Sequence, residues 1–130
     1  MPITITKEDG YFLIKPSRGV DYLEILEAIL KLTSSEKYIG KHGIWHFEEG
    51  PMNFEVRDID RIKNLISEVY PEDTQYSKIA LVSNSVLHVQ LAHAFTKVAE
   101  TLPFEFMYFA EIESAEIWIR ENAVQKQSAI

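Results

Sequence analysis

Apolar and polar residues alternate through the first sixteen positions of the chain, in two runs separated by a turn. The runs are "ITIT" and "YFLIKP", and "KEDG" lies between them. A period of two is typical of strands, because successive side chains of a strand point to opposite faces. Asp9-Gly10 is a strong hairpin signal, since glycine readily takes the positive φ that tight turns require. The pattern therefore predicts two short strands joined as a hairpin.

The stretch from Tyr22 to Thr33 has helical periodicity, but its apolar arc is unusually wide. Asp21 is the predicted N-cap. Eight apolar positions cover more than half of the circumference, and only Glu24, Glu27 and Lys31 form a polar stripe. A surface helix needs an apolar stripe of only ~100° to dock on a core. The excess width predicts burial on a second side, with two alternatives: a helix wedged between the sheet and a neighbouring helix, or a homodimer interface.

Strands and helices alternate through the rest of the chain. An apolar stripe of Ile59, Ile62, Ile66 and Val69 marks one helix, and Pro71 ends it. The continuous apolar run in "KIALVS" is typical of a parallel strand that is covered on both faces. The predicted elements of this part are strands at 42–47, 78–83 and 104–109, and helices at about 55–70, 86–102 and 112–122.

The element order is β-β-α-β-α-β-α-β-α, which predicts an α/β domain with a mixed, mostly parallel sheet. Right-handed crossovers then put helices on both faces of the sheet. Residues 1–122 are expected to form one domain, which is long enough to bury a core. The last residues, 123–130, carry little pattern and are expected to form a flexible tail.

The net charge of −7, from 13 basic and 20 acidic residues, narrows the choice of partners. Nucleic acids and anionic membranes both attract basic surfaces, so we expect neither as a partner. The chain has no cysteine, which excludes disulfides, thiol catalysis and Cys-ligated metals. No apolar stretch approaches the ~20 residues of a membrane span, and the N-terminus lacks the pattern of a signal peptide. We therefore expect a cytoplasmic protein.

Motifs in the C-terminal third carry a resemblance to a known family. The segment "KIALVSNSVLHVQLAHAF" ends a strand in a small polar turn and continues into a helix, and "FEFMYFAEIESAEIWI" adds a strand, an acidic turn and a final helix. The chain thereby resembles the SpoIIAA-like group of the STAS superfamily, small bacterial α/β domains related to anti-sigma-factor antagonists. In the first half of the chain only the element order matches. The residues that carry the resemblance are Leu91, Ala92, Phe95, Phe109, Glu111, Glu113, Ala115, Trp118 and Ile119.

The resemblance implies a non-catalytic domain that binds a partner protein or a small ligand. It also implies that Ala115, Trp118 and Ile119 form the stripe by which the final helix packs on the sheet. In the antagonist branch of the family, a serine at the start of the helix after the middle strand is phosphorylated and switches partner binding. The corresponding segment here, "EEGPMNFEVRDID", contains no Ser or Thr, so we do not expect the phosphoserine switch.

Any functional site is expected beyond the carboxyl ends of the parallel strands, where ligands of open α/β sheets sit. The apolar members of this edge, Met52 and Phe54, either form a contact surface or fold under and seal the core. The N-terminus of the predicted helix at about 86–102 would accept an acidic or polar group, while Met52 and Phe54 supply apolar contact. The candidate residues of this strand-end edge are Glu48, Glu49, Met52, Phe54, Ser83, Asn84, Ser85 and His88.

The stretch Ser83-Asn84-Ser85 allows a plain and a functional interpretation. Ser and Asn are favoured at helix N-caps, because their side-chain oxygens accept hydrogen bonds from the N–H groups of the first helical turn. The same N–H groups can also bind an anion. His88 falls on the arc of its helix that faces the sheet, near the serines, but no orienting third group or Gly-x-Ser-x-Gly turn accompanies it. His42 and His46 share one face of a strand without a third ligand, so we expect neither a metal nor another cofactor.

These observations favour a binding or regulatory module without catalysis of its own, which contacts another protein through the strand-end edge. A carrier of a small apolar or lipid-like molecule is one alternative, suggested by the wide apolar face of the helix from Tyr22 to Thr33. A hydrolase that uses Ser83 or Ser85 with His88 is another.

Overall fold

A computed structural model describes residues 3–16, 21–34, 37, 41–47, 55–69, 77–83, 86–100, 102 and 104–121. Within these ranges the strands and helices follow the predicted order. The tail at 123–130 lies outside the described residues. The elements are β1 (Ile3–Glu8), β2 (Tyr11–Pro16), α1 (Tyr22–Thr33), β3 (Gly43–His46), α2 (Val56–Val69), β4 (Lys78–Val82), α3 (Val86–Ala99), β5 (Glu105–Phe109) and α4 (Ile112–Arg120).

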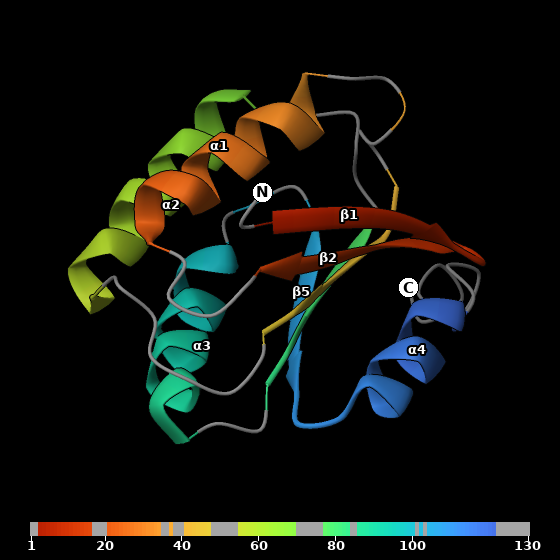
Figure 1. Cartoon of the computed structure of the whole chain (residues 1–130). Helices are drawn as coiled ribbons and strands as arrows, with labels where there is room; N and C mark the ends of the chain where they lie inside the picture. The colour runs from red at the N-terminus through yellow and green to blue at the C-terminus, as the bar shows by residue number, and fades with distance from the viewer. Residues whose placement is uncertain are drawn as a thin grey trace, which may run out of the picture.

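The strands form one sheet in the order β1-β2-β3-β4-β5, so each strand lies beside the one that precedes it in sequence. β1 pairs antiparallel with β2, and the pairings from β2 to β5 are parallel. Every crossover steps in the same direction, and right-handed crossovers therefore place α1, α2 and α3 on one face. α4 follows the edge strand β5 and lies on the other face (Figure 1). The predicted mostly parallel sheet with helices on both faces is confirmed.

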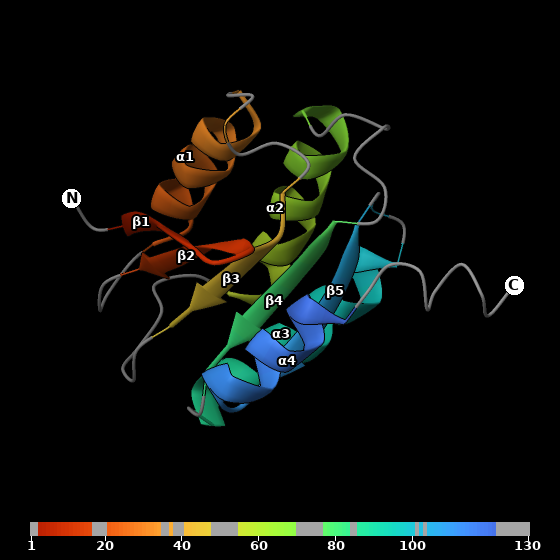
Figure 2. The same cartoon turned by 90° about the vertical axis from the view of Figure 1, so that its right-hand side faces the viewer.

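An apolar cluster on each face attaches the helices to the sheet. The cluster on the three-helix face includes Ile25 of α1, Ile62 of α2 and Ala99 of α3. On the opposite face, Ala115 and Ile119 of α4 are buried together with side chains of β3 and β4. Figure 2 shows α4 lying across β4 and β5. The final helix thus packs through the stripe that the sequence indicated.

The N-terminal hairpin turns at the predicted Asp9-Gly10, but β1 runs two residues further than predicted, through Lys7 and Glu8. Glu8 pairs with Tyr11, which leaves Asp9 and Gly10 as a two-residue loop. Gly10 has a φ of 89°, a conformation that side chains with a Cβ rarely adopt. The positive φ that the Asp9-Gly10 signal predicted is therefore present at Gly10.

A reciprocal pair of hydrogen bonds begins α1 at the predicted N-cap. The Asp21 carboxylate accepts from the backbone N–H of Glu24 at 3.0 Å, and the Glu24 carboxylate accepts from the backbone N–H of Asp21 at 3.2 Å. This capping box satisfies two donors that the first helical turn would otherwise leave without a partner. It also fixes the point at which the chain enters α1.

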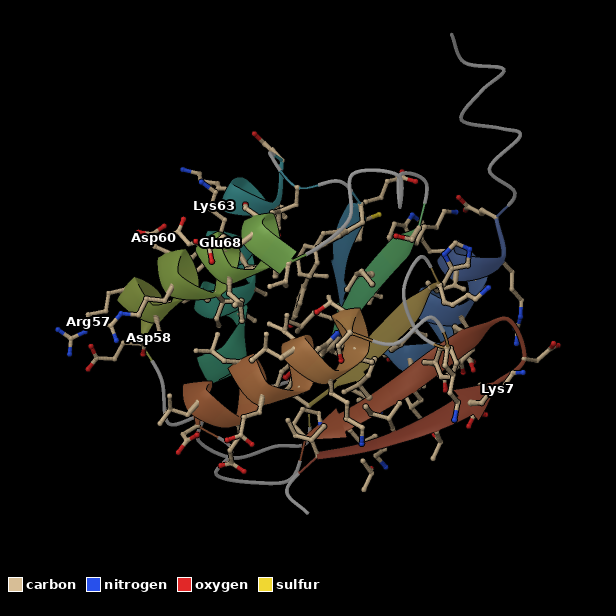
Figure 3. The ribbon with its side chains drawn as sticks, turned by 90° about the horizontal axis from the view of Figure 1, so that it is seen from above. Lys7, Arg57, Asp58, Asp60, Lys63 and Glu68 are labelled. Carbon is tan, nitrogen blue, oxygen red and sulfur yellow. The ribbon has the colours of Figure 1, made fainter. Side chains whose placement is uncertain are left out.

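α2 places apolar side chains against the core and charged ones toward solvent. Ile59, Ile62 and Ile66 are buried, as their spacing predicts. Figure 3 labels charged side chains of the opposite, solvent side, among them Asp60 and Glu68. One acidic residue behaves differently: the buried Asp58 carboxylate accepts a hydrogen bond from the backbone N–H of Glu55 at 2.9 Å.

Two helices end earlier than predicted. α3 ends at Ala99 rather than Leu102, whose N–H instead donates to the Ala99 carbonyl in a tightened last turn. This turn places the Leu102 side chain in the core. α4 ends at Arg120 rather than Asn122, at the point where Lys78 binds carbonyl oxygens of its last turn. None of the described helices is long and apolar enough to cross a membrane.

Candidate interaction site

Ser83 lies at the carboxyl end of β4, in the middle of the predicted strand-end edge. Its backbone N–H donates to the carbonyl of Phe109 at 3.0 Å, and its own carbonyl accepts from the Tyr108 hydroxyl at 2.6 Å. The residue is only 1% exposed. These bonds join the ends of β4 and β5, so Ser83 lies beneath the surface of this edge rather than on it.

The other predicted residues of the strand-end edge are not placed by the structure. His88 belongs to α3, but its side chain lies outside the described part of the chain. The interpretation of Ser83-Asn84-Ser85 as a helix cap, and the proximity of His88 to the serines, therefore stay predictions. The residues that lie outside the described ranges are Glu48, Glu49, Met52, Phe54, Asn84 and Ser85.

The outer face of α1 carries two exposed leucines that nothing in the single chain covers. Ile25 and Ile29 are buried in the core, whereas Leu23 is 56% exposed and Leu30 is 46% exposed. The two exposed leucines are seven residues apart, which is about two helical turns, so they lie on the same side of α1. A wedge between sheet and neighbouring helix thus accounts for only part of the wide apolar arc. The rest of the arc, Leu23 and Leu30, lies on the surface.

Lys78 is a buried cation in the first position of β4, and the sequence pattern did not identify its role. It is 5% exposed. Its ammonium donates to the carbonyl oxygens of Trp118 and Glu121, both at 2.8 Å, and lies 5.3 Å from the centre of the Trp118 ring. A cation at this place complements the negative end of the α4 dipole. The only sequence signal was a lysine at the start of an otherwise apolar strand.

His42 acts as a hydrogen-bond acceptor just before β3. Its Nδ1 accepts the backbone N–H of Lys78 at 2.9 Å, which requires the neutral imidazole. Burial lowers the pKa of His42 below its usual 6.5, and the positive charge of Lys78 lowers it further. Across the described residues, no group of three or more His, Asp or Glu side chains is arranged to hold a metal ion. His42 therefore connects β3 to β4 at the amino ends of the strands.

A second contact holds α4 to the hairpin side of the sheet. The buried Tyr11 hydroxyl of β2 donates to the Glu116 carboxylate at 2.6 Å, although the two residues are 105 positions apart. Burial, followed by the hydrogen bond to Glu116, raises the pKa of Tyr11 to about 12. The phenol is therefore a neutral donor at physiological pH. The Tyr11–Glu116 hydrogen bond thus holds the middle of α4, and the Lys78 ammonium holds its C-terminal end.

No protein-family model matches this chain, and comparisons with curated proteins and with solved structures return no significant match.

Proposed function

We propose that this chain is a binding module that contacts another protein and performs no catalysis of its own. The observation that carries the proposal is the uncovered pair Leu23 and Leu30 on the outer face of α1. Large apolar side chains that are exposed together on one side of a helix are a common mark of a protein contact. The likeness to the SpoIIAA-like group and a cytoplasmic location belong to the same proposal. The packing stripe of α4 supports the likeness to the SpoIIAA-like group.

The strand-end edge is the second contact surface that we propose. Its support is the rule that ligands of open parallel sheets bind beyond the strand ends. Ser83 would act there from below, because its backbone ties β4 to β5 while the side chains of the edge make the contact. Replacing Ser83, Ser85 and His88 by Ala is the direct test, and unchanged partner binding would remove this surface from the proposal.

The carrier and the hydrolase are supported less well. The carrier was suggested by the excess apolar width of α1, but Leu23 and Leu30 turn that excess toward solvent rather than toward an internal cavity. A hydrolase needs a serine that its substrate can reach. Ser83 is 1% exposed and does not meet that requirement, which leaves Ser85 as the candidate nucleophile of that alternative.

Affinity capture from the cells that make this protein tests the leading proposal. Three baits are compared: the natural chain, the Leu23→Glu/Leu30→Glu double variant, and the Ile117→Glu variant. Ile117 is 65% exposed on α4 and serves as a matched control for adding charge to a surface apolar residue. We expect a protein that is held by the natural chain and by Ile117→Glu but lost with the double variant. An identical set of proteins on all three baits would contradict the proposal for α1.

A further inference from the structure

Five ionisable side chains form one row across the sheet, on the face that α4 covers. The strand register places Glu8 of β1 beside Tyr11 of β2, and Lys78 of β4 beside Glu105 of β5. His42 lies between these two pairs, one residue before the first position at which β3 pairs with β2 and β4. Side chains at neighbouring positions of paired strands point to the same face of a sheet. We refer to these five residues as the polar row.

The C-terminal half of α4 is bonded to the polar row at two places. In the middle of the helix, the Tyr11 hydroxyl donates to the Glu116 carboxylate at 2.6 Å. At its C-terminal end, the Lys78 ammonium donates to two carbonyl oxygens of the last turn, both at 2.8 Å. His42 is bonded to the residue that makes the second contact, since its Nδ1 accepts the backbone N–H of Lys78 at 2.9 Å. A change at His42 therefore acts on the end of α4 through Lys78.

We propose that the polar row makes the end of α4 a pH-sensitive switch, in which protonation of His42 releases the last turn of α4 from the sheet. The acceptor of the Lys78 N–H is the unprotonated Nδ1, so the added proton occupies that atom and removes the hydrogen bond. The proton also creates a second cation close to the Lys78 ammonium, in a residue that is only 5% exposed. Like charges repel strongly where little water screens them. The ammonium relieves this repulsion by moving outward to water, and that movement breaks its bonds to the carbonyl oxygens of α4.

The charges around His42 set the direction of the response. Burial holds the pKa of His42 below 6.5, the positive charge of Lys78 lowers it further, and the negative charge of Glu105 opposes both. Histidine is the side chain that ordinarily gains its charge between pH 5 and 8. The last turn of α4 is therefore held at pH 7 and is released as the pH falls below 6.5 through the pKa of His42 in the folded chain. The other charged residues of the packed elements are Lys41 beside His42, Glu8 on β1, and Glu116, Arg120 and Glu121 on α4.

The hydrogen bond between Tyr11 and Glu116 limits the release to the end of α4. The pKa of Tyr11 is about 12, so its hydroxyl remains a donor throughout the range in which His42 titrates. This bond holds the middle of the helix, next to the buried Ala115. Helix ends open at a lower free energy than packed interiors. We therefore expect a local opening of the last turn rather than the loss of α4 as a whole.

The released turn uncovers part of the apolar cluster beneath α4. Ile119 is 3% exposed and belongs to the cluster that also contains Ile44 and Ala80. When Ile119 leaves this cluster at low pH, apolar side chains of the helix and of the sheet meet solvent. This surface is separate from the exposed leucines of α1, so the switch does not depend on the function proposed for α1.

An NMR titration of the full natural chain, from about pH 8 down through the midpoint of His42, tests the switch. We expect the backbone amides of Ile119, Arg120 and Glu121 to become mobile on the nanosecond timescale, with the same midpoint as the His42 ring. The methyl contacts of Ile119 with β3 and β4 should vanish with that midpoint, while the amides of α3 stay rigid. A last turn that stays ordered when His42 is protonated would overturn the proposal. So would a chain that loses all its contacts together in this range.

Three variants assign the response to its residues. His42→Gln keeps an acceptor for the Lys78 N–H but gains no proton, so the last turn should stay ordered at every pH of the series. His93→Gln is the matched control, because His93 is exposed on α3, and it should behave like the natural chain. Tyr11→Phe removes the contact in the middle of α4, so the release should then extend to Glu116. A last turn that becomes mobile in His42→Gln as it does in the natural chain would show that another group drives the opening.

Discussion

Lys78 illustrates how a single side chain can determine where a helix ends. Its ammonium holds two carbonyl oxygens at the C-terminus of α4, and its backbone N–H is held by His42. A buried lysine is rare unless its charge is compensated. Here carbonyl oxygens and the Trp118 ring provide that compensation. The residue thus connects β4 to the start of β3 through its backbone N–H and to the end of α4 through its ammonium.

Replacing Lys78 by Met tests this role. Hydrogen bonds that involve a charged group contribute about 1.5–3 kcal/mol, and Met fills a similar volume, so we expect a loss of about 2 kcal/mol in the free energy of unfolding. Urea unfolding measures that loss, and hydrogen exchange should show faster exchange in the last turn of α4. Lys97→Met is the control, because Lys97 is exposed on α3. Equal stability of the two variants would contradict the role assigned to Lys78.

The acceptor role of His42 predicts a pH dependence of stability. The pKa of His42 in the folded chain lies below 6.5, the value expected when the chain is unfolded. Between these two pKa values the unfolded chain binds more protons than the folded chain. The contribution of neutral His42 to the free energy of unfolding is therefore fully present above pH 6.5 and falls as the pH drops toward the folded pKa. Unfolding experiments across this window should show the decline, and an NMR titration of His42 should give a midpoint below 6.5.

Two variants separate the contribution of His42 from that of other groups. His42→Gln keeps an acceptor for the Lys78 N–H but does not titrate, so the decline due to this residue should disappear. His93→Gln should leave the decline unchanged, because His93 is exposed on α3. If both variants show the natural pH profile, protonation of His42 is not what weakens the fold in this window.

At the scale of elements, the capping box of α1 gives the clearest test. Asp21→Ala removes the side chain that accepts the N–H of Glu24. Loss of an N-cap of this type costs about 1 kcal/mol. Asp60→Ala, on the solvent side of α2, should change the free energy of unfolding by no more than about 0.5 kcal/mol. Thermal or urea unfolding of both variants compares the two values, and equal losses would argue against the capping box.

The predictability of each element depended on how local its signal was. Asp9-Gly10, Asp21 and the isoleucine spacing of α2 act within a few residues, and the sequence identified all three. The ends of α3 and α4 were missed because contacts with the rest of the fold accompany them. Leu102, three residues after the end of α3, turns into the core, and Lys78, far away in sequence, holds the end of α4. Neither contact can be read from the local sequence of the helix.

The candidate site was predictable to a smaller degree for the same reason. The sequence revealed that the apolar arc of α1 is too wide for one contact, but only packing decides which part is covered. Ile25 and Ile29 face the core, while Leu23 and Leu30 face solvent. At the strand-end edge, Ser83 was expected among surface residues. It is instead buried, and its backbone N–H and carbonyl are hydrogen-bonded to residues of β5. The spacing of apolar and polar residues does not tell how deeply a given side chain is buried.

At the scale of the whole molecule, the charge of −7 makes stability depend on salt. Raising the ionic strength from about 0.01 M to about 0.1 M shortens the Debye length from about 30 Å to about 10 Å. Repulsion between the acidic side chains of the folded chain then weakens, so we expect the melting temperature to rise, as measured by thermal unfolding. A melting temperature that falls with salt would indicate a fold held by ion pairs instead.

The order of the strands also decides when each part of the fold can form during synthesis. Because each strand pairs with the strand before it in sequence, each pairing can close as soon as the next segment has left the ribosome. α4 arrives last, and until then the face that contains Ile44, Ala80 and Val82 lacks its cover. A chain released before residue 112 would therefore display a finished sheet with one apolar side exposed to water. Chaperones and proteases would recognise such a truncated product by that side.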